Sequence, residues 1–474
     1  MQQNNSILFV DMDNTLLATD VLWESIFLLC RHKPLLVLML PLWALKGKVY
    51  FKQQVHNHVA PNPSALPVHT SVLEYLHKEK ESGRTIVLAT ATLRTVAQPI
   101  ANHFGIFDDV IATTDGANLG GAAKLEVMRT MAGNRPFAYI GDRSVDIPIW
   151  QGSNDALVVN PTTALRKKAN VEFTHVFTEP KATLTTYLKA IRVHQWVKNL
   201  LLFVPLFMAH KAGNIQLLMQ CFLGFVTFSL CASAVYLLND LLDLEADREH
   251  PRKRKRPFAS GMIPVQYGVV LVPLLLTLAF GISLWVLPLQ FTAALLLYMI
   301  FTSAYSFYLK SKLIIDVLML AGLYAFRLLA GGVVVDVFVS RWMLAFSMFM
   351  FLSLAFIKRY TELQAVLEQN KETAKGRGYT VSDNEMIRSI GPASGYMAVL
   401  VLALYINSTD VVQLYKSPSR LWLIEPMLLY WITRIWFLAH RGDVHDDPII
   451  FALKDKRSYI VFAICAVVVV LATM

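Results

Sequence analysis

Cysteine is scarce in this 474-residue chain, which has only Cys30, Cys221, Cys231 and Cys465. None of them forms a Cys-x-x-Cys pair or stands at metal-ligand spacing from histidine, and three fall inside long apolar runs. This pattern argues against a disulfide framework and a cysteine-based metal site. The N-terminal stretch MQQNNSILFVDMDNT also lacks the basic residues and the cleavable apolar run of an export signal. We therefore expect nothing there to export the N-terminal part.

Charged residues are few as well. They make up 16% of the chain against 55% hydrophobic residues, and the mean hydropathy of +0.45 is typical of a membrane protein. Residues 1–185 carry charges at ordinary soluble spacing, whereas residues 190–474 are long apolar runs broken by short basic loops. The net charge of +10 therefore indicates membrane topology and not a nucleic-acid partner. We predict two domains with these bounds.

Short β-rich runs alternate with amphipathic stretches in residues 1–185, and each run ends in polar residues. This alternation predicts an α/β fold with a doubly wound parallel sheet and a site at the carboxyl ends of its strands. The expected strands are 7–13, 85–92, 109–113, 137–142 and 155–159.

A long insertion, about residues 20–66, separates the first two expected strands and predicts a cap over the sheet. It contains PLLVLMLPLWALKGK at 34–48. The apolar core of this stretch is about a dozen residues, whereas crossing a bilayer takes about 20. Two interpretations stay open: a cap helix, or a segment lying in the membrane interface.

The C-terminal part predicts an all-helical membrane domain of about nine segments. Loops that follow even-numbered segments carry 18 lysines and arginines, and loops that follow odd-numbered segments carry 4. This asymmetry predicts a protein of the cytoplasmic (inner) membrane, with the even loops and the N-terminal domain on the cytosolic side. The expected segments lie near 199–209, 216–238, 264–286, 288–307, 313–335, 342–357, 391–407, 421–438 and 458–474.

Asp11 and Asp13 stand two residues apart in DMDNTL, at the end of the first expected strand and on the same side of it. One carboxylate there can attack phosphorus while its neighbour handles the proton of the leaving group. Asp142 and Asp146 in GDRSVD close another strand and could complete a Mg²⁺ site with oxygen ligands.

Two further residues suit a phosphate substrate. Thr90, at the end of TIVLAT, can donate to a phosphoryl oxygen, and Lys124 in GGAAKLE supplies positive charge for the transition state. The ordered set resembles the haloacid dehalogenase-like hydrolases over about residues 6–180. The resemblance implies Asp11 as nucleophile, Asp13 as general acid and base, Thr90 and Lys124 as phosphate ligands, Asp142 as metal ligand, and Asp146 in support. A degenerate, purely structural domain is the alternative.

The second constellation is NDLLDLEADREHPRKRKRPFASG at 239–261. Asp240, Asp243 and Asp247 follow i, i+3 and i+7 spacing, which predicts three carboxylates on one helix face. Such a face binds Mg²⁺, which in turn binds diphosphate. The basic residues that follow can hold phosphate oxygens directly. The alternative to such a binding site is a solvated basic loop at the cytosolic end of a helix, without a ligand.

This motif and the nine segments resemble the UbiA family of intramembrane prenyltransferases, whose first acidic motif reads NDxxDxxxD. The resemblance spans about 190–474. Typical members carry a second acidic motif, DxxxD, in the loop after the sixth segment. Here that loop begins KRYTEL (358–363) and runs to Arg388 without it. One acidic motif with many cations indicates a donor that carries an additional phosphate.

The extended pattern NDxxDxxxDRxHPxKRxRPxAxG is similar to the branch that contains polyprenyl-phosphate phosphoribosyltransferases. RVHQWVKNLLLFVP (192–205), AGG (330–332) and DDPIIFALKDKRS (446–458) match that branch too. The resemblance implies Mg²⁺-dependent transfer of 5-phosphoribose from phosphoribosyl pyrophosphate to a polyprenyl phosphate, with pyrophosphate as the leaving group.

Polar residues in or near the apolar segments complete the predicted site. Arg327 lies mid-segment, where an unpaired cation costs ~2.5–3.5 kcal/mol or more, so it should face Asp316 or a substrate phosphate. A structural ion pair or ordinary interhelical hydrogen bonding is the alternative for such residues. The predicted substrate-binding residues are Lys198, Asn199, Asn239, Arg248, His250, Lys253, Arg254, Arg256, Tyr305, Lys310, Asp316, Arg327, Lys358 and Arg359.

The fusion suggests that the phosphatase removes the 5-phosphate of the lipid-linked product on the same side of the bilayer, because tethering raises its effective concentration. Two rival interpretations stay open. One is a conventional UbiA enzyme that joins a prenyl diphosphate to an aromatic acceptor, beside an unrelated phosphatase. The other is a lipid-binding scaffold in which both sites have decayed.

Overall fold

The computed structural model describes residues 6–114, 118–368, 377–444 and 447–474. The chain divides into two compact units. The first comprises residues 1–191 and 236–273, and the second comprises 192–235 and 274–474. Residues 236–273, which carry the aspartate-rich motif, thus belong to the first unit.

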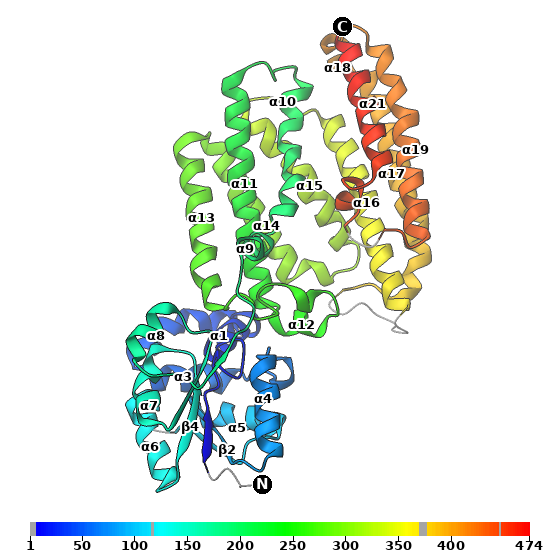
Figure 1. The fold of residues 1–474 in the computed structure, drawn as a ribbon. Helices are drawn as coiled ribbons and strands as arrows, with labels where there is room; N and C mark the ends of the chain where they lie inside the picture. The colour runs from blue at the N-terminus through cyan, green and yellow to red at the C-terminus, as the bar shows by residue number, and fades with distance from the viewer. Residues whose placement is uncertain (1–5, 115–117, 369–376, 445–446) are drawn as a thin grey trace. The chain divides into compact units, whose positions relative to one another are not determined.

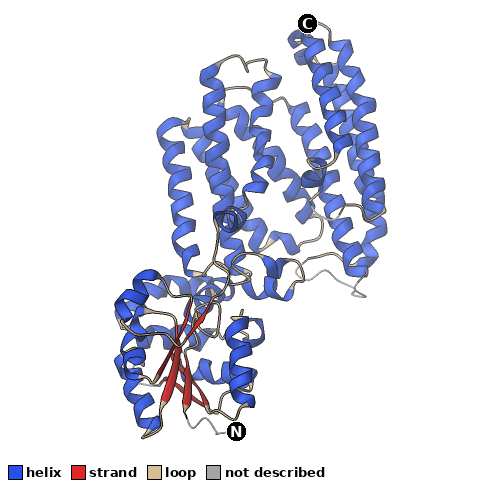
Figure 2. Ribbon diagram, in the orientation of Figure 1, coloured by secondary structure: helices blue, strands red, loops and turns tan. Residues whose placement is uncertain are grey.

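The described strands form one parallel sheet in the first unit, with the order β3-β2-β1-β4-β5-β6 (Figures 1 and 2). This confirms the predicted α/β fold. The order reverses beside β1, so the carboxyl ends of β1, β2 and β4 open onto a common crevice. Their bounds are β1 Ile7–Val10, β2 Ile86–Leu93, β3 Asp109–Thr113, β4 Phe137–Gly141, β5 Asp155–Val159 and β6 His175–Phe177.

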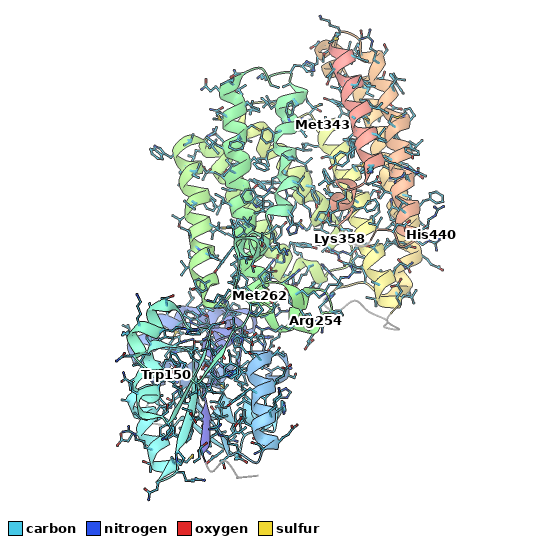
Figure 3. The ribbon with its side chains drawn as sticks, viewed as in Figure 1. Trp150, Arg254, Met262, Met343, Lys358 and His440 are labelled. Atoms are coloured by element: carbon cyan, nitrogen blue, oxygen red, sulfur yellow. The ribbon has the colours of Figure 1, made fainter. Side chains whose placement is uncertain are left out.

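Helices cover both faces of the sheet, as the nearly continuous apolar strands require. The helices that lie between and after the strands are α4 Thr70–Glu81, α5 Arg94–Phe104, α6 Ala122–Ala132, η3 Ser144–Asp146, α7 Ile147–Gly152, α8 Thr163–Ala169 and α9 Leu184–Ala190. One core cluster packs Leu8 and Val10 of β1 against Val72 and Ile100. The cluster on the other face contains Trp150 (Figure 3).

The predicted insertion is a small helical cap. Its elements are α1 Val21–His32, η1 Pro34–Met39, α2 Leu40–Leu45, α3 Lys48–His58 and η2 Pro63–Ala65. Asp20 begins α1 by accepting hydrogen bonds from the backbone N–H groups of Leu22 and Trp23. Ile26, Leu29, Trp43 and Val55 form the core of the cap.

In the described ranges, eight helices are long and apolar enough to cross a membrane. Their bounds are α11 Ile215–Leu242, α13 Gln266–Val286, α14 Leu289–Phe307, α15 Ile315–Val334, α16 Arg341–Leu367, α17 Asn384–Ile406, α19 Ile424–His440 and α21 Lys456–Thr473. The remaining short helices are α12 Leu244–Glu249 and η5 Lys253–Lys255 in the first unit, and η4 Val193–Phe203, α10 Val204–Met208, η6 Leu309–Ser311, η7 Val381–Asp383, α18 Thr409–Leu414, η8 Pro418–Leu423 and α20 Pro448–Ala452 in the second.

These eight helices match the second to ninth predicted segments, but the first prediction is corrected. Residues 199–209 divide between the 3₁₀ helix η4 and the five-residue helix α10. Pro205 lies in the first turn of α10, where its missing N–H leaves no hydrogen bond unmade. In the interior of one continuous helix over 199–209, the same proline would remove a backbone hydrogen bond. The apolar run therefore breaks before it can span a bilayer.

The second unit packs tightly where small residues allow helices to approach. α16 packs against both α15 and α17. A Cβ atom on Gly391 of α17 would come within 2.2 Å of Trp436 on α19, so only glycine fits there. Ser353 of α16 donates to the Gly391 carbonyl at 2.8 Å and accepts from Trp436 at 3.0 Å.

Candidate functional sites

The first site lies at the crevice beside β1. Asp11 and Asp13 follow this strand, and Asp142 follows β4, so the strand order alone brings them together. Lys124 enters from α6 and Asp146 from η3. Thr90 lies inside β2, which continues to Leu93 with a shift of register after Ala89.

Lys124 is the centre of this cluster. Its buried ammonium donates to Asp11 Oδ1 at 3.0 Å and lies 3.8 Å from Asp146 Oδ1. It also donates at 2.9 Å to the Tyr139 hydroxyl, which itself donates to Asp146 at 2.9 Å. Tyr139 was not among the predicted site residues. It occupies an inward position of β4, and only the folded sheet shows that it orients both Lys124 and Asp146.

Asp11, Asp142 and Asp146 form the single group of potential metal ligands found among the described residues. One carboxylate oxygen from each lies within 4.8 Å of the others. Burial raises the pKa of Asp142 well above its usual value, and the nearby Asp11 adds to the effect. Three clustered carboxylates with one lysine suit Mg²⁺, which prefers oxygen ligands. The donor set thus fits the predicted ion.

Asp13 is held apart from that group. Its Oδ1 accepts from the Val21 backbone N–H at 2.8 Å, and its Oδ2 accepts from the Thr92 hydroxyl at 2.9 Å. Burial raises the pKa of Asp13 to about 7, with a further contribution from Asp20. A carboxyl group with a pKa near neutrality suits general acid–base work. Thr92, which the sequence reasoning missed, thus orients the predicted acid–base residue.

The buried Thr90 hydroxyl accepts from the Thr92 backbone N–H at 3.1 Å, which leaves its own proton for another acceptor. Lys52 reaches the same region from cap helix α3. Its ammonium donates to the Ala91 carbonyl at 2.6 Å and to Asn118 at 2.9 Å. Burial lowers the pKa of Lys52. The cap therefore contributes a cation next to β2, which no local sequence signal reveals.

The second constellation, the aspartate-rich motif, differs from the single helix face that its spacing predicts. α11 ends at Leu242 and α12 begins at Leu244, so the helix is interrupted at Asp243. Arg256 Nη1 lies 3.0 Å from Asp240 and 2.5 Å from Asp247, whereas Asp243 pairs with Arg31. Asp240 and Asp247 therefore share one cation, and Asp243 faces another.

The other predicted residues of this motif fall into two groups. Arg248 forms a buried bidentate pair with Glu24, at 2.6 and 3.1 Å. His250, Lys253 and Arg254 are exposed, and His250 Nδ1 accepts from the Arg252 backbone N–H at 3.2 Å. Asn239 is half-buried in the last turn of α11. Arg248 thus has a buried partner, whereas the half-exposed Lys253 lies 4.0 Å from Asp247 Oδ1.

Polar side chains of the second unit form two groups between helices. In the first, Asp316 of α15 accepts from the Tyr305 hydroxyl at 2.7 Å and pairs with Arg359 at 2.5 Å and with Arg377 at 3.5 Å. Arg359 also pairs with Glu362. The Lys310 carbonyl accepts from Arg377 at 3.5 Å.

Arg327 belongs to the second group. It donates to Asn199 at 2.9 Å, to the Tyr298 hydroxyl at 2.9 Å and to the Leu323 carbonyl. Of the two partners that the sequence suggested for Arg327, Asp316 is instead bound by Arg359 and Arg377. Asn199 also donates to Ser229 at 2.9 Å, which fixes its amide toward Arg327.

A third feature of this unit is Asp447, which lies between two lysines. Lys198 Nζ is 2.5 Å and Lys358 Nζ 3.7 Å from Asp447 Oδ2 (Figure 3 labels Lys358). A small cavity opens there, and its lining residues are Leu320, Tyr324, Leu354, Ala355, Lys358, Asp447, Pro448 and Ile449. The sequence motif 446–458 pointed to this region, but it did not single out Asp447.

Comparison with known proteins matches the two parts of the chain separately. Residues 200–452 match the UbiA prenyltransferase family, and residues 8–151 match the haloacid dehalogenase-like hydrolases. The uncharacterized protein y4nM of Sinorhizobium fredii is 34% identical over 470 residues, which cover 98% of this chain and 90% of the relative.

Two shorter relatives match the C-terminal part. Decaprenyl-phosphate phosphoribosyltransferase of Mycobacterium tuberculosis is 32% identical over 289 residues, covering 59% of this chain and 92% of the relative. Nodulation protein NoeC of Azorhizobium caulinodans is 35% identical over 283 residues, covering 59% of this chain and 91% of the relative. Among solved structures, a UbiA homolog from Archaeoglobus fulgidus aligns with a TM-score of 0.47 and 16% identity, covering 60% of this chain and 98% of that one.

Proposed function

Because this chain belongs to the UbiA prenyltransferase family and carries a haloacid dehalogenase-like hydrolase domain, we propose that it is a bifunctional multi-pass membrane enzyme. The membrane part transfers 5-phosphoribose from phosphoribosyl pyrophosphate to a polyprenyl phosphate. The hydrolase part then removes the 5-phosphate. The similarity to a decaprenyl-phosphate phosphoribosyltransferase over 92% of that relative carries the first step of the proposal.

The aspartate-rich motif is the proposed pyrophosphate site. Asp240 and Asp247 are buried and share Arg256, so this position already holds positive charge between two carboxylates. Mg²⁺ bound there would neutralise the leaving pyrophosphate. Arg256 would then be free to contact a phosphate oxygen, and the exposed Lys253 and Arg254 supply further charge. Asp243, which pairs with Arg31, would have to change partner to join a metal site.

The acceptor phosphate is assigned to the two lysines around Asp447. Lys198 and Lys358 bring two positive charges to one carboxylate, so one of them can bind a phosphate while Asp447 holds the other. The small cavity beside them is lined mainly by apolar residues such as Leu320, Leu354 and Ile449, which can contact the part of an isoprenoid chain next to the phosphate. This site would hold a lipid phosphate within the second unit.

The hydrolase residues suit a two-step phosphoryl transfer. Asp11 attacks the 5-phosphorus, the bond to the ribose oxygen breaks, and Asp13 gives its proton to that oxygen. Water then attacks the phosphorus of the acyl phosphate, Asp13 takes the water proton, and Asp11 is restored. Lys124 and Thr90 stabilise the phosphoryl oxygens. Mg²⁺ held by Asp11, Asp142 and Asp146 would reduce the repulsion between the phosphate and Asp11.

We place both steps at the cytosolic side of the inner membrane, on the strength of the loop charges and the domain fusion. The products would be pyrophosphate, inorganic phosphate and polyprenyl-phosphoryl ribose. This ordering explains why one chain carries both domains, since tethering raises the local concentration of the lipid product.

Incubation of reconstituted protein with phosphoribosyl pyrophosphate labelled in the ribose, a polyprenyl phosphate and Mg²⁺ tests the transferase step. The proposal predicts label in an organic-soluble lipid that depends on the acceptor. A conventional prenyltransferase would leave this label in the aqueous phase and would instead consume a prenyl diphosphate and an aromatic acceptor. The phosphatase step is tested separately by inorganic phosphate released from the purified lipid product.

A further inference from the structure

The apolar stretch of the cap, Pro34–Leu45, is unusually exposed. It has no polar side chain in its sequence, PLLVLMLPLWAL, and forms η1 and α2. Leu35, Leu38 and Leu45 are 80%, 77% and 84% exposed, and Leu42 is 53% exposed. A helix in a soluble cap would present polar residues at such positions. A contiguous apolar surface of this kind marks a contact with another apolar phase.

Trp43 fixes the direction in which this surface faces. It is the single residue of the stretch that is buried, and it packs in the cap core with Ile26, Leu29 and Val55. Its ring also stacks on His58 of α3, with centroids 5.6 Å apart. The segment is therefore docked on its own domain through Trp43, with Leu36 and Leu40 packed against the same core. The four exposed leucines, Leu35, Leu38, Leu42 and Leu45, lie outside that core.

Basic residues flank the apolar surface on both sides. Lys33 precedes it, and Lys46 and Lys48 follow it, all exposed. No acidic residue occurs from 31 to 48. Leucines framed by lysines are the pattern of a segment that inserts into the interface of a bilayer with anionic lipids. Twelve residues are too short to cross a hydrocarbon core of about 30 Å.

We propose that residues 34–45 are a membrane-docking segment that inserts shallowly into an anionic lipid surface. The described part of the same chain contains eight helices long and apolar enough to cross a membrane, so the cap is tethered covalently to a membrane domain. α3 begins two residues after the segment and carries Lys52, which donates to the Ala91 carbonyl beside Thr90. Docking would therefore hold the cap side of the hydrolase site at the lipid surface, where a lipid-linked phosphate is presented.

A fluorophore at Leu38 of the full-length protein tests this inference without reference to the substrate. Leu38→Cys is made after the four native cysteines are replaced by alanine, labelled, and reconstituted in nanodiscs with anionic lipids. Val127→Cys on α6, which is also an exposed apolar position of the first unit, is the matched control. We expect lipids with brominated acyl chains to quench the Leu38 label several-fold more than the control, and aqueous iodide to show the reverse order.

A second experiment tests whether Lys33, Lys46 and Lys48 contribute to binding of the anionic lipid surface. In the background K33E/K46E/K48E, we expect bromolipid quenching at Leu38 to fall at least twofold in anionic nanodiscs. The inference is overturned if the Leu38 label is quenched by iodide as strongly as the Val127 label and is insensitive to bromolipids. It is also overturned if neither quencher reaches the Leu38 label, because protein and not lipid would then cover the segment.

Discussion

The Lys198 ammonium lies 2.5 Å from the Asp447 carboxylate, although 248 residues separate them in the sequence. Lys358 lies 3.7 Å from the same oxygen atom. Opposite charges oppose the effect of burial and lower the pKa of Asp447 to about 2. The carboxylate is therefore ionised at neutral pH and keeps two lysine side chains oriented beside an apolar cavity. This arrangement is the basis of the proposed acceptor site.

Replacement of Lys198 by methionine should weaken acceptor binding and leave the hydrolase site intact. Losing one charge-assisted hydrogen bond costs about 1.5–3 kcal/mol, so the KM for polyprenyl phosphate should rise about 10- to 100-fold. The measurement is transferase kinetics in nanodiscs, with phosphatase turnover of a soluble phosphate ester as a check on folding. Lys416→Met, at an exposed lysine of the same unit, is the control. An unchanged KM would remove Lys198 from the acceptor site.

Asp240→Asn should reduce transferase turnover by about 100-fold or more, because it removes charge from the proposed Mg²⁺–pyrophosphate site. Chelation of divalent ions should reduce the wild-type rate similarly, and added Mg²⁺ should restore it. Asp443→Asn, at an exposed aspartate, should behave like wild type. If Asp240→Asn retained full turnover, the Asp240–Arg256 pair would be structural only.

Asp11→Asn should separate the two activities. The variant keeps the shape of the side chain but loses the nucleophile, so phosphatase turnover should disappear while ribose transfer continues. Mass spectrometry of the lipid fraction should then show the product with its 5-phosphate. Asp109→Asn, at an exposed position at the start of β3, is the control. Release of phosphate at the wild-type rate would mean that another group performs the attack.

His56 should make the first unit sensitive to mild acid. Both ring nitrogens are buried without hydrogen-bond partners, and burial, with a smaller contribution from Lys52, lowers the pKa of His56 to about 4. Between pH 6.5 and 4 the unfolded chain binds a proton that the folded chain excludes, so stability falls as the pH falls through this window. The loss is about 1 kcal/mol at pH 5.5.

The test compares His56→Leu with wild type by thermal inactivation of phosphatase activity. The wild-type midpoint should drop by about 2–4 °C more than that of the variant between pH 7.5 and 5.5. His77→Leu, at an exposed histidine of α4, should follow wild type. If the inactivation midpoints of wild type and His56→Leu fell equally with pH, the claim that His56 is buried as a neutral imidazole would be wrong.

The sequence predicted what depends on local patterns. Apolar runs ending in aspartate located β1 and β4, and eight of the apolar segments became long helices. β6 was not predicted because His175–Phe177 is only three residues long. The helix break near Pro205 was not predicted because the residues around it form a continuous apolar run. These errors arise where an element is too short for its periodicity to be read.

Contacts between distant segments could not be predicted. Tyr139 of β4 orients Lys124 of α6, and Thr92 of β2 orients Asp13, which follows β1. Asp447 meets Lys198 only in the folded second unit. The three aspartates of the motif also have different ion-pair partners, which their spacing in the sequence does not show. Arg31 of the cap pairs with Asp243, whereas Arg256 of the motif itself pairs with Asp240 and Asp247.

A double-label experiment tests the central claim most directly. The donor is phosphoribosyl pyrophosphate with ¹⁴C in the ribose and ³²P in the 5-phosphate, given to wild type, Asp11→Asn and Asp240→Asn in the same membranes. The account predicts lipid with ¹⁴C alone from wild type, equal molar ¹⁴C and ³²P from Asp11→Asn, and neither label from Asp240→Asn. Wild-type lipid without ¹⁴C, or with both labels in equal amount, would contradict it.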